Sequence, residues 1–503
     1  MNEISFHQRK YFWEILSLIL FSGSLILVSC FHEMWRDEMQ AWLIATHASS
    51  LSELYQNTRY EHHPMGWFFL LWMLHFISAN PESMKVLNGL IAISTVSVLL
   101  FCSPFARPQK VMIAFGYYLF FEYGIIARNY LIGALLLFLI CSLWNQKRKY
   151  LWLIFLLLFL LCQTNIFALL IALALAATLA AEFISNKWKQ PSDDSRPRFL
   201  LYLFLFLAGV LLTIKLLIPP SDDKAAFAFN FHYDWLHLRL TLSGIGKGLL
   251  PIPPLSLHGW NSYVISGLYP EISLFLVLVF ALFFWHDKRV FLFFLLALVS
   301  VFAFFYSRYD GLSRHYGHYF LITVVGFWLY YSGAQKAKRT NVFNRTISYL
   351  AIGLFNLALL AQVYANAVCV GEDIVHPFSN GKNAAAYIEK NYPGVMLSGN
   401  YYSLTTVSGY LRKDYVNLLT LKLQSFYIWK QGYADTGSGD SIPINLSKLL
   451  HEVKDDPFVF ITSGPPAYNP NDFDFSTEPL QSFTGAIQAD EDFYLYLIKP
   501  KEK

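Results

Sequence analysis

The sequence predicts a mainly α-helical membrane protein with about eleven transmembrane helices, interfacial helices in the first outer loop, and a small C-terminal soluble α/β domain. Three observations lead to this fold class. Of the 503 residues, 55% are hydrophobic and only 14% are charged, whereas soluble domains contain about 25% charged residues. Apolar stretches of membrane-spanning length recur up to residue 369, and the residues beyond are polar and rich in Gly, Pro, Asn and Asp. We therefore expect a transmembrane domain over residues 1–369 and a soluble domain over residues 370–503.

The apolar stretches set the predicted number of spans. They lie near residues 13–31, 84–104, 110–127, 128–144, 150–167, 168–184, 199–218, 271–285, 290–307, 317–333 and 347–367. Two pairs form continuous apolar stretches, which we interpret as helical hairpins with short turns at FEYGIIARN and QTN. The segment 66–79, beginning GWFFLLWMLHFIS, is shorter, aromatic-rich and interrupted by His75. This composition favours a helix that lies in the membrane interface.

The distribution of basic residues supports this arrangement. If residues 66–79 do not span, every basic cluster falls on one side of the membrane, which the positive-inside rule assigns to the cytoplasm. The clusters are Arg9/Lys10, Arg107/Lys110, Lys147/Arg148/Lys149, Lys187/Lys189/Arg196/Arg198, Lys288/Arg289 and Lys336/Lys338/Arg339/Arg345. The N-terminus is then cytoplasmic and the C-terminal domain extracytoplasmic. A loop from Pro219 to Pro270 also lies outside.

Other features limit the function classes. The net charge of +4 is small and scattered, which argues against nucleic-acid binding. None of the five cysteines has metal-ligand or disulfide spacing. LVSC at residues 27–30 resembles a bacterial lipoprotein cleavage box, but the apolar run is longer than a signal-peptide core. We expect the first helix to remain uncleaved.

The C-terminal region has the patterns of an α/β domain. VMLSG and PFVFITS are short, β-branched and aromatic runs that predict strands. NGKNAAAYIEKN has the spacing of an amphipathic helix.

An acidic pair, Asp37 and Glu38, follows the first span in WRDEMQAWLIA. Trp35, Met39 and Trp42 recur at helical spacing, which predicts an interfacial helix with these side chains facing lipid. Ionisable groups near the bilayer usually mark a functional site. Partial desolvation is expected to raise the pKa of Asp37, as suits a general base. The alternative is a solvated helix end.

A second polar cluster, RYEHHPMGWFFL, contains Glu61, His62 and His63 directly before Pro64. Proline can open a helix at its first turn. Adjacent histidines are poor co-ligands on a helix, so we predict no metal site here. These side chains are expected to line a substrate pocket.

Two further clusters flank predicted spans. FEYGIIARNY contains Glu122, Arg128 and Tyr130. Glu122 and Arg128 either form a mutual ion pair that stabilises the turn or supply a second acid and an anion contact.

The last cluster, SRYDGLSRHYGHYFL, contains Arg308, Arg314 and His315 before a span. Arginine suits phosphate because its planar fork donates two parallel hydrogen bonds. A basic loop facing an acidic loop at the lipid surface predicts a substrate with a phosphate and a reactive hydroxyl.

The arrangement resembles the GT-C superfamily of integral-membrane glycosyltransferases, especially its protein-mannosyltransferase and aminoarabinose-transferase branch. The likeness rests on a long first span, the acidic pair in WRDEMQAWLIA, and HPMGWFFLLW, over roughly residues 10–335. By this resemblance Asp37 is the catalytic aspartate with Glu38 beside it, and Arg314 in RHYGHYFL contacts the carrier phosphate. His63 replaces a frequent Lys, and the second-loop acid near ARNY, with Glu122 upstream, does not align cleanly.

The resemblance implies transfer of a sugar from a polyprenyl-phosphate donor to a glycan, lipid or protein acceptor on the extracytoplasmic face. No cofactor is demanded, although a divalent cation bridging Asp37 and the phosphate is chemically compatible. The membrane is expected to be a bacterial inner membrane. The alternatives are a polytopic transporter or lipid flippase, whose polar residues belong near the bilayer midplane, and a non-catalytic scaffold that displays the outer domain.

Overall fold

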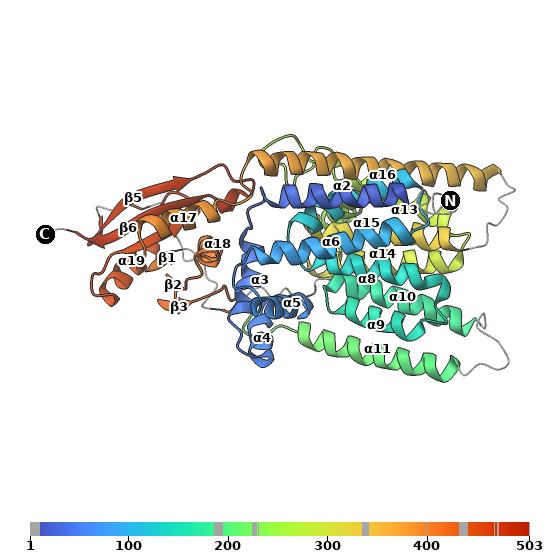
Figure 1. Cartoon of the computed structure of the whole chain (residues 1–503), viewed down its shortest axis with the longest axis horizontal. Helices are drawn as coiled ribbons and strands as arrows, with labels where there is room; N and C mark the ends of the chain where they lie inside the picture. The colour runs from blue at the N-terminus through green and yellow to red at the C-terminus, as the bar shows by residue number, and fades with distance from the viewer. Residues whose placement is uncertain are drawn as a thin grey trace, which may run out of the picture.

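The structure is a computed structural model. It consists of a helical bundle with a sheet domain at one end (Figure 1). It describes residues 11–185, 195–223, 229, 231–333, 342–399, 401–431, 441–466, 468–469 and 472–501. Seven basic residues used to predict the topology lie outside these ranges: Arg9, Lys10, Lys187, Lys189, Lys336, Lys338 and Arg339.

Each of the eleven predicted spans is helical. Among the described residues, seven helices are long and apolar enough to cross a membrane. They are α2 (Phe12–Ser29), α6 (Ser83–Cys102), α10 (Ile166–Ile184), α11 (Ser195–Leu217), α13 (Tyr269–Phe284), α14 (Lys288–Arg308) and α16 (Val342–Val375). The others are shorter or more polar: α7 (Arg107–Ala114) with the π-helix η1 (Tyr118–Ile125), α8 (Tyr130–Leu143) with η2 (Trp144–Gln146), α9 (Leu151–Cys162) and α15 (Ser313–Ser332). The predicted helical membrane fold is confirmed.

The first outer loop holds three short helices between the bundle and the sheet domain (Figure 1). They are α3 (Arg36–Thr46), α4 (Leu51–Thr58) and α5 (Gly66–His75). Ten residues of helix extend only about 15 Å, half of a hydrocarbon core about 30 Å thick, so α5 is too short to span. The Gly66 N–H donates to the Gln163 carbonyl at 3.1 Å. A Cβ on Gly66 would lie 2.4 Å from that oxygen, so only glycine permits this approach to the QTN turn.

The predicted lipid-facing stripe on α3 is wrong. Trp35, Met39 and Trp42 are at most 3% exposed. Trp35 packs edge-on against Trp260, and Met39 lies beneath α18 (Tyr401–Leu411) of the sheet domain, where a Cβ on Gly409 would approach its sulfur to 2.7 Å. The apolar stripe is therefore covered by protein, which the spacing of the residues does not reveal.

The predicted outer loop from Pro219 to Pro270 contains an additional helix, α12 (Trp235–Leu249), which precedes the short η3 (Ser266–Leu268). α12 packs against α13 and α15. Three glycines permit the close contact, because a Cβ on Gly244, Gly246 or Gly248 would come within 2.7 Å of a neighbouring residue. The Gly-rich pattern SGIGKGLL hid this helix from a search based on hydropathy.

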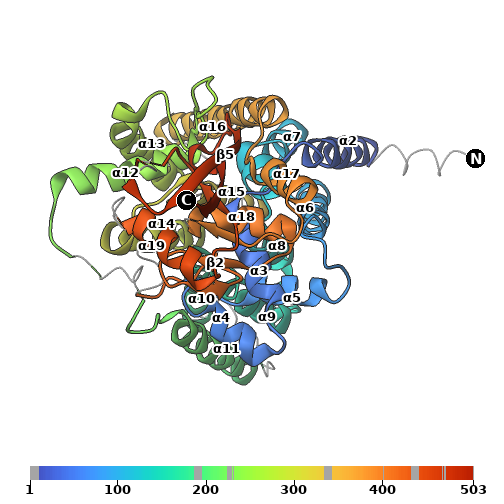
Figure 2. The ribbon, with the colours of Figure 1, turned by 90° about the vertical axis from the view of Figure 1, so that its left-hand side faces the viewer.

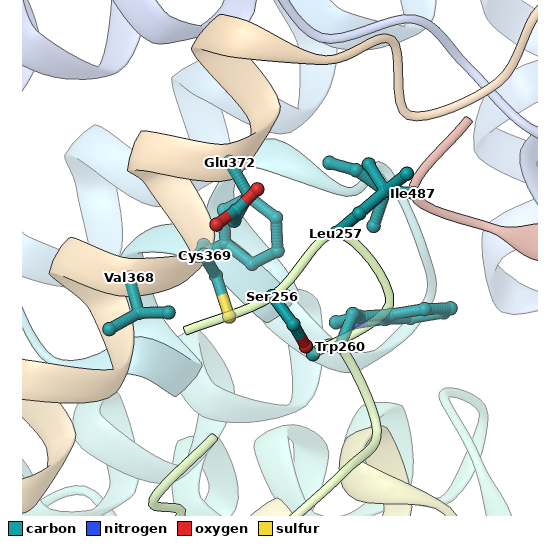
Figure 3. Close-up of a pocket in the computed structure, with 9 residues that line it drawn as sticks. Ser256, Leu257, Trp260, Val368, Cys369, Glu372 and Ile487 are labelled. Carbon is teal, nitrogen blue, oxygen red and sulfur yellow. The ribbon is translucent and has the colours of Figure 1, made fainter. Parts of the chain in front are cut away.

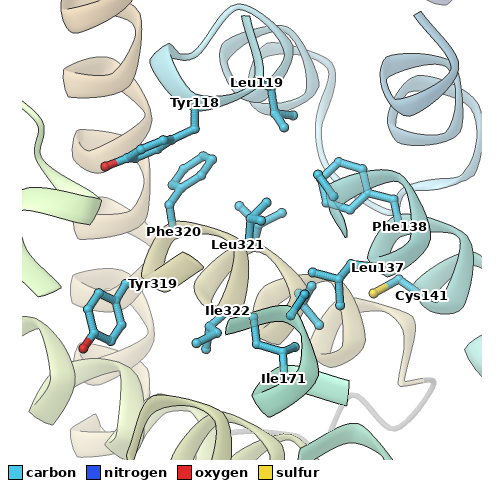
Figure 4. Packing of buried hydrophobic residues seen from close by; sticks show 14 of the residues in the cluster. Tyr118, Leu119, Leu137, Phe138, Cys141, Ile171, Tyr319, Phe320, Leu321 and Ile322 are labelled. Carbon is cyan, nitrogen blue, oxygen red and sulfur yellow. The ribbon is translucent and has the colours of Figure 1, made fainter. Parts of the chain in front are cut away.

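The bundle interior is aromatic and aliphatic, with η1, α8, α10 and α15 contributing side chains to one cluster (Figure 4). At the bundle end away from the sheet domain, basic residues share acidic partners. Lys147 Nζ lies 2.7 Å and Arg289 Nε 3.9 Å from the Glu182 carboxylate. Two of the predicted cytoplasmic clusters therefore meet at the same end, as the positive-inside argument requires.

The sheet domain, called the outer domain from here on, is built on a six-stranded sheet of order β3-β2-β1-β4-β6-β5. Figure 2 shows this domain facing the viewer. Its strands are β1 (Leu397–Gly399), β2 (Tyr415–Asn417), β3 (Lys422–Gln424), β4 (Phe458–Thr462), β5 (Phe475–Phe483) and β6 (Phe493–Pro500). β1 is parallel to β2 and β4, whereas β3, β6 and β5 pair antiparallel to their neighbours. The predicted strands at VMLSG and PFVFITS correspond to β1 and β4.

Helices cover both faces of this sheet because side chains alternate along a strand. Val459 and Ile461 of β4 pack with α17 (Gly381–Asn391) and α18. Phe458 and Phe460 pack with α19 (Ser441–Glu452). A short η5 (Ala489–Glu491) precedes β6. The boundary expected at 369/370 falls inside α16, which continues from the bundle to Val375.

Candidate active site

The start of α3 is fixed by Glu38. Its carboxylate accepts the Trp35 N–H at 3.2 Å and the Ala127 N–H at 2.7 Å. The same carboxylate lies 3.2 Å from His32, whose other ring nitrogen lies 2.9 Å from Asp373 of α16. Burial alone would lower the pKa of His32, but Asp373 and Glu38 outweigh it and raise this pKa to about 9. Glu38, predicted as catalytic, is thus engaged in ordering the site.

Asp37 lies one residue away and points into a cluster of arginines. Its Oδ2 accepts a short hydrogen bond from Arg128 and lies 3.3 Å from Arg314 Nη2. Arg36 Nε lies 3.9 Å from Oδ1. Burial alone would raise the pKa of Asp37, but the charges of Arg128, Arg314 and Arg36 hold it well below its ordinary range. The expectation of a raised pKa is therefore wrong, because it considered desolvation without the arginines.

A cavity of about 600 Å³ adjoins this cluster. It is large enough for a drug-sized ligand. Eight of the predicted site residues contribute to its wall: Asp37, Glu61, His62, His63, Arg128, Arg308, Arg314 and His315. Residues from all four of the predicted polar clusters therefore line one cavity.

Glu122 and Tyr130 lie behind this wall. The Glu122 carboxylate accepts a short hydrogen bond from Tyr117 and one from Trp260 Nε1 at 3.0 Å. Tyr130 is buried with the Arg128 guanidinium 5.9 Å above its ring. Of the two alternatives for this pair, the mutual ion pair is not formed, because Arg128 pairs with Asp37. Arg128 lines the cavity, whereas Glu122 is not among its wall residues.

The second cluster supplies the polar side of the wall. Glu61 accepts a hydrogen bond from Gln40 Nε2 at 2.8 Å, and burial raises its pKa to about 7. His62 Nε2 lies 2.9 Å from the Asp223 carboxylate. Burial, reinforced by the charge of Arg128, lowers the pKa of His63 to about 3, so this imidazole is neutral at physiological pH. Its Nδ1 is buried and has no hydrogen-bond partner in the described part of the chain.

The late basic cluster faces the acidic pair. Arg314 reaches Asp37 from α15, and its Nε is buried without a hydrogen-bond partner among the described residues. Arg308 lies 4.8 Å from the Phe229 ring centroid. His315 accepts the Leu312 N–H at 3.0 Å, which caps α15. The Arg314 side chain, which is 14% exposed, therefore lies in the cavity wall beside Asp37.

An apolar wall continues from this polar end. It consists of Ile166, Phe167, Ile214, Leu217, Ile218 and Phe304, from α10, α11 and α14. Leu217 and Ile218 end a helix with many lipid-exposed side chains. The space thus joins a cationic centre to an apolar surface at the bundle periphery.

Sequence reasoning missed several polar or aromatic wall residues, among them Gln40, Tyr427 and Trp429. Gln40 lies within WRDEMQAWLIA, one helical turn after Asp37, and that spacing was a usable signal. Tyr427 and Trp429 belong to the outer domain and carry no motif. Within the described ranges, no group of three or more His, Cys, Asp or Glu residues is arranged to hold a metal ion.

A second cavity, of about 10 Å³, lies between α16 and the outer domain and is lined by Cys369, Glu372, Trp260 and Ile487 (Figure 3). A single water needs a comparable volume. This cavity is too small for a sugar or a prenyl group.

Comparison with protein families gave no match, and comparison with curated proteins gave none either. The crystal structure of ArnT from Cupriavidus metallidurans bound to undecaprenyl phosphate aligns with a TM-score of 0.53 at 11% sequence identity, over 97% of this chain and 98% of ArnT. The chain has the fold of ArnT. The apo ArnT structure gives the same TM-score and identity over 95% and 97% of the two chains. Arabinofuranosyltransferase AftD from Mycobacteria aligns with a TM-score of 0.41 at 11% identity, over 97% of this chain and 40% of AftD.

The ArnT likeness extends through both the bundle and the outer domain, since nearly the whole of each chain is aligned. The fold expected from WRDEMQAWLIA and HPMGWFFLLW, that of an aminoarabinose-transferase-like membrane protein, is thereby confirmed. At this identity the likeness establishes the fold, and the roles of individual residues rest on the geometry of the cavity.

Proposed function

We propose that the protein transfers a sugar from a polyprenyl-phosphate donor to an acceptor hydroxyl at the extracytoplasmic membrane face. One observation carries the proposal: a single cavity joins arginines and a carboxylate to an apolar wall at the bundle periphery. A polyprenyl-phosphate sugar has the same order of groups, with a sugar, an anionic phosphate and an apolar prenyl chain. The ArnT structure bound to undecaprenyl phosphate supports this choice of carrier.

In this proposal Arg314, Arg128 and Arg308 bind the carrier phosphate. Arg314 and Arg128 both line the cavity, and both contact the Asp37 carboxylate. The prenyl chain leaves along Ile214, Leu217 and Phe304 toward the lipid. His63 remains neutral and adds a hydrogen bond without charge.

Binding of the phosphate would activate Asp37. The charges of Arg128 and Arg314 lower the pKa of Asp37 and so suppress its basicity. Opposite charges about 4 Å apart attract by about 4 kcal/mol at an effective dielectric constant of about 20. A phosphate that takes over these guanidinium contacts removes much of that attraction, so the pKa of Asp37 returns toward its ordinary range. The donor thereby frees the base.

The reaction then proceeds by a single displacement. The acceptor oxygen bonds to the anomeric carbon, and its proton passes to Asp37. The bond between the anomeric carbon and the phosphate oxygen breaks, and the electron pair leaves with the polyprenyl phosphate. Arg314 and Arg128 stabilise the charge that develops there. Attack opposite the leaving group inverts the anomeric configuration, by analogy with inverting glycosidases.

The test is release of undecaprenyl phosphate from a panel of undecaprenyl-phosphate pentoses and hexoses by the purified protein in lipid nanodiscs, with lipid and oligosaccharide hydroxyls supplied as acceptors. We expect at least one donor to be cleaved and its sugar to appear in inverted configuration. A flippase would move these lipids across a vesicle membrane without cleaving them. Cleavage with retained configuration would remove Asp37 from its proposed role.

A further inference from the structure

One segment of the outer domain, residues 425–431, reaches the cavity. We name it the strap. It follows β3 and contributes Tyr427 and Trp429, whereas the other wall residues of the cavity belong to the bundle and its outer loops. The strap is thus the part of the described outer domain that a substrate in the cavity would touch.

One end of the strap is hydrogen-bonded to α3, the helix that carries Asp37. Gln40 donates from Nε2 to the Tyr427 carbonyl at 2.7 Å and accepts the Tyr427 N–H at its Oε1 at 3.0 Å. The same Nε2 lies 2.8 Å from Glu61. Gln40 is only 8% exposed, so both ends of its amide are committed to holding Tyr427 one helical turn from Asp37.

The other end is fastened to the segment that follows α11. The Gln431 N–H donates to the Asp222 carbonyl at 2.8 Å, and Lys430 Nζ lies 3.3 Å from the Asp222 carboxylate. Tyr60 also donates to Asp222, at 2.9 Å. The strap therefore joins α3, which carries Asp37, to the segment after α11, which is one of the three helices that form the apolar wall.

The two aromatic rings between these anchors are held at a fixed angle. The Tyr427 and Trp429 ring centroids are 4.6 Å apart with an interplanar angle of 89°. The C–H groups on the flat face of a sugar ring carry partial positive charge, and an aromatic face carries the negative part of its quadrupole. A rigid aromatic wall in the same cavity as the Glu61 carboxylate suits a ligand with one apolar face and a polar edge.

Building on the proposed function, we propose that the strap is a sugar-binding wall on which Trp429 stacks the ring of the donor or acceptor sugar. A prenyl chain is a poorer occupant, because the strap lies against polar groups and a separate apolar wall is formed by α10, α11 and α14. The outer domain thereby selects the sugar, while the bundle holds the carrier phosphate.

The test compares the wild type with Trp429→Ala, with Trp429→Phe, which keeps an aromatic face, and with Tyr494→Ala, a half-buried control on β6. Native mass spectrometry in nanodiscs measures the affinity for undecaprenyl phosphate and for the panel of its glycosides. Saturation-transfer NMR with free oligosaccharides measures acceptor binding.

We expect Trp429→Ala to weaken binding of a glycoside or of an oligosaccharide about tenfold and to change the affinity for undecaprenyl phosphate less than twofold. Trp429→Phe restores most of the lost affinity, and Tyr494→Ala resembles the wild type. Loss confined to glycosides identifies the donor sugar, and loss confined to oligosaccharides identifies the acceptor.

Unchanged binding of every sugar ligand by Trp429→Ala would overturn the strap inference and leave the transferase proposal intact. A wild type that binds no undecaprenyl phosphate and no glycoside would instead overturn the proposed function, and the strap inference with it.

Discussion

Replacing Asp37 by Asn separates the capture of the carrier from the transfer of the sugar. The amide keeps the shape of the side chain but removes the charge that pairs with Arg128 and, at 3.3 Å, with Arg314. A phosphate then meets two guanidinium groups with no competing carboxylate. An ion pair of this kind contributes about 4 kcal/mol at an effective dielectric constant of about 20. If the loss of the Asp37 charge adds a third of that free energy to the attraction between the arginines and the phosphate, binding strengthens about tenfold.

The transfer rate should change in the opposite direction. Loss of a general base lowers the rate by about 10²–10⁴-fold. Affinity for undecaprenyl phosphate is measured by native mass spectrometry in nanodiscs, and transfer by its release from a cleaved glycoside. Asp414→Asn is the matched control, because Asp414 pairs with His47 at the end of the same helix and is 39% exposed.

Two results would refute this reasoning. An Asp37→Asn variant with wild-type transfer rate would show that another group takes the acceptor proton. Weaker binding of undecaprenyl phosphate in this variant would show that the arginines do not hold the carrier, because removing a negative charge from a phosphate site cannot weaken it electrostatically.

Four further predictions concern the cavity, the His32 cluster and the topology. The pKa of Glu61 is raised to about 7, so the cavity gains a negative charge as pH rises through 7. The affinity for a glycosyl phosphodiester, titrated from pH 5.5 to 8.5, should therefore fall over this range. In Glu61→Gln the affinity should not depend on pH over the same range. Glu38→Ala leaves a protonated His32 with one acidic partner and should reduce stability by about 3–5 kcal/mol, measured by thermal unfolding in detergent. Because the pKa of His32 is raised from 6.5 to about 9, its contribution is complete below pH 6.5 and is lost as pH rises through 9; a His32→Gln variant that keeps the wild-type slope would contradict this. For topology, an impermeant maleimide should label Asp455→Cys in intact cells but Lys149→Cys only after permeabilisation, and the reverse pattern would invert the predicted orientation.

Much of the fold was predictable because a bilayer imposes strong and local rules. Long apolar stretches must become helices, and basic clusters mark one side, as the shared contacts of Lys147 and Arg289 with Glu182 illustrate. The helix α12 was missed because its glycines lower its hydropathy while permitting close packing. Hydropathy also fails to distinguish a side chain facing lipid from one facing protein, which explains the wrong assignment of Trp35 and Met39.

The candidate site was predictable as a set of residue types but not as a set of contacts. Ionisable residues beside spans identified Asp37, Arg128 and Arg314, because charge is rare there. Their pairing inverts the expected direction of the Asp37 pKa shift, since the charges of Arg128, Arg314 and Arg36 together outweigh desolvation. Tyr427 reaches the cavity across 387 residues of sequence, and nothing near it in the chain predicts that contact.

The most direct test of the account is mass spectrometry of the lipids that copurify with the wild type, with Arg314→Ala, and with Arg239→Ala as a control arginine that pairs with Glu271 outside the cavity. The account predicts a polyprenyl phosphate or its glycoside in the wild type and in Arg239→Ala, and its depletion in Arg314→Ala. Only bulk phospholipid in all three, or equal retention of the carrier by Arg314→Ala, would contradict it.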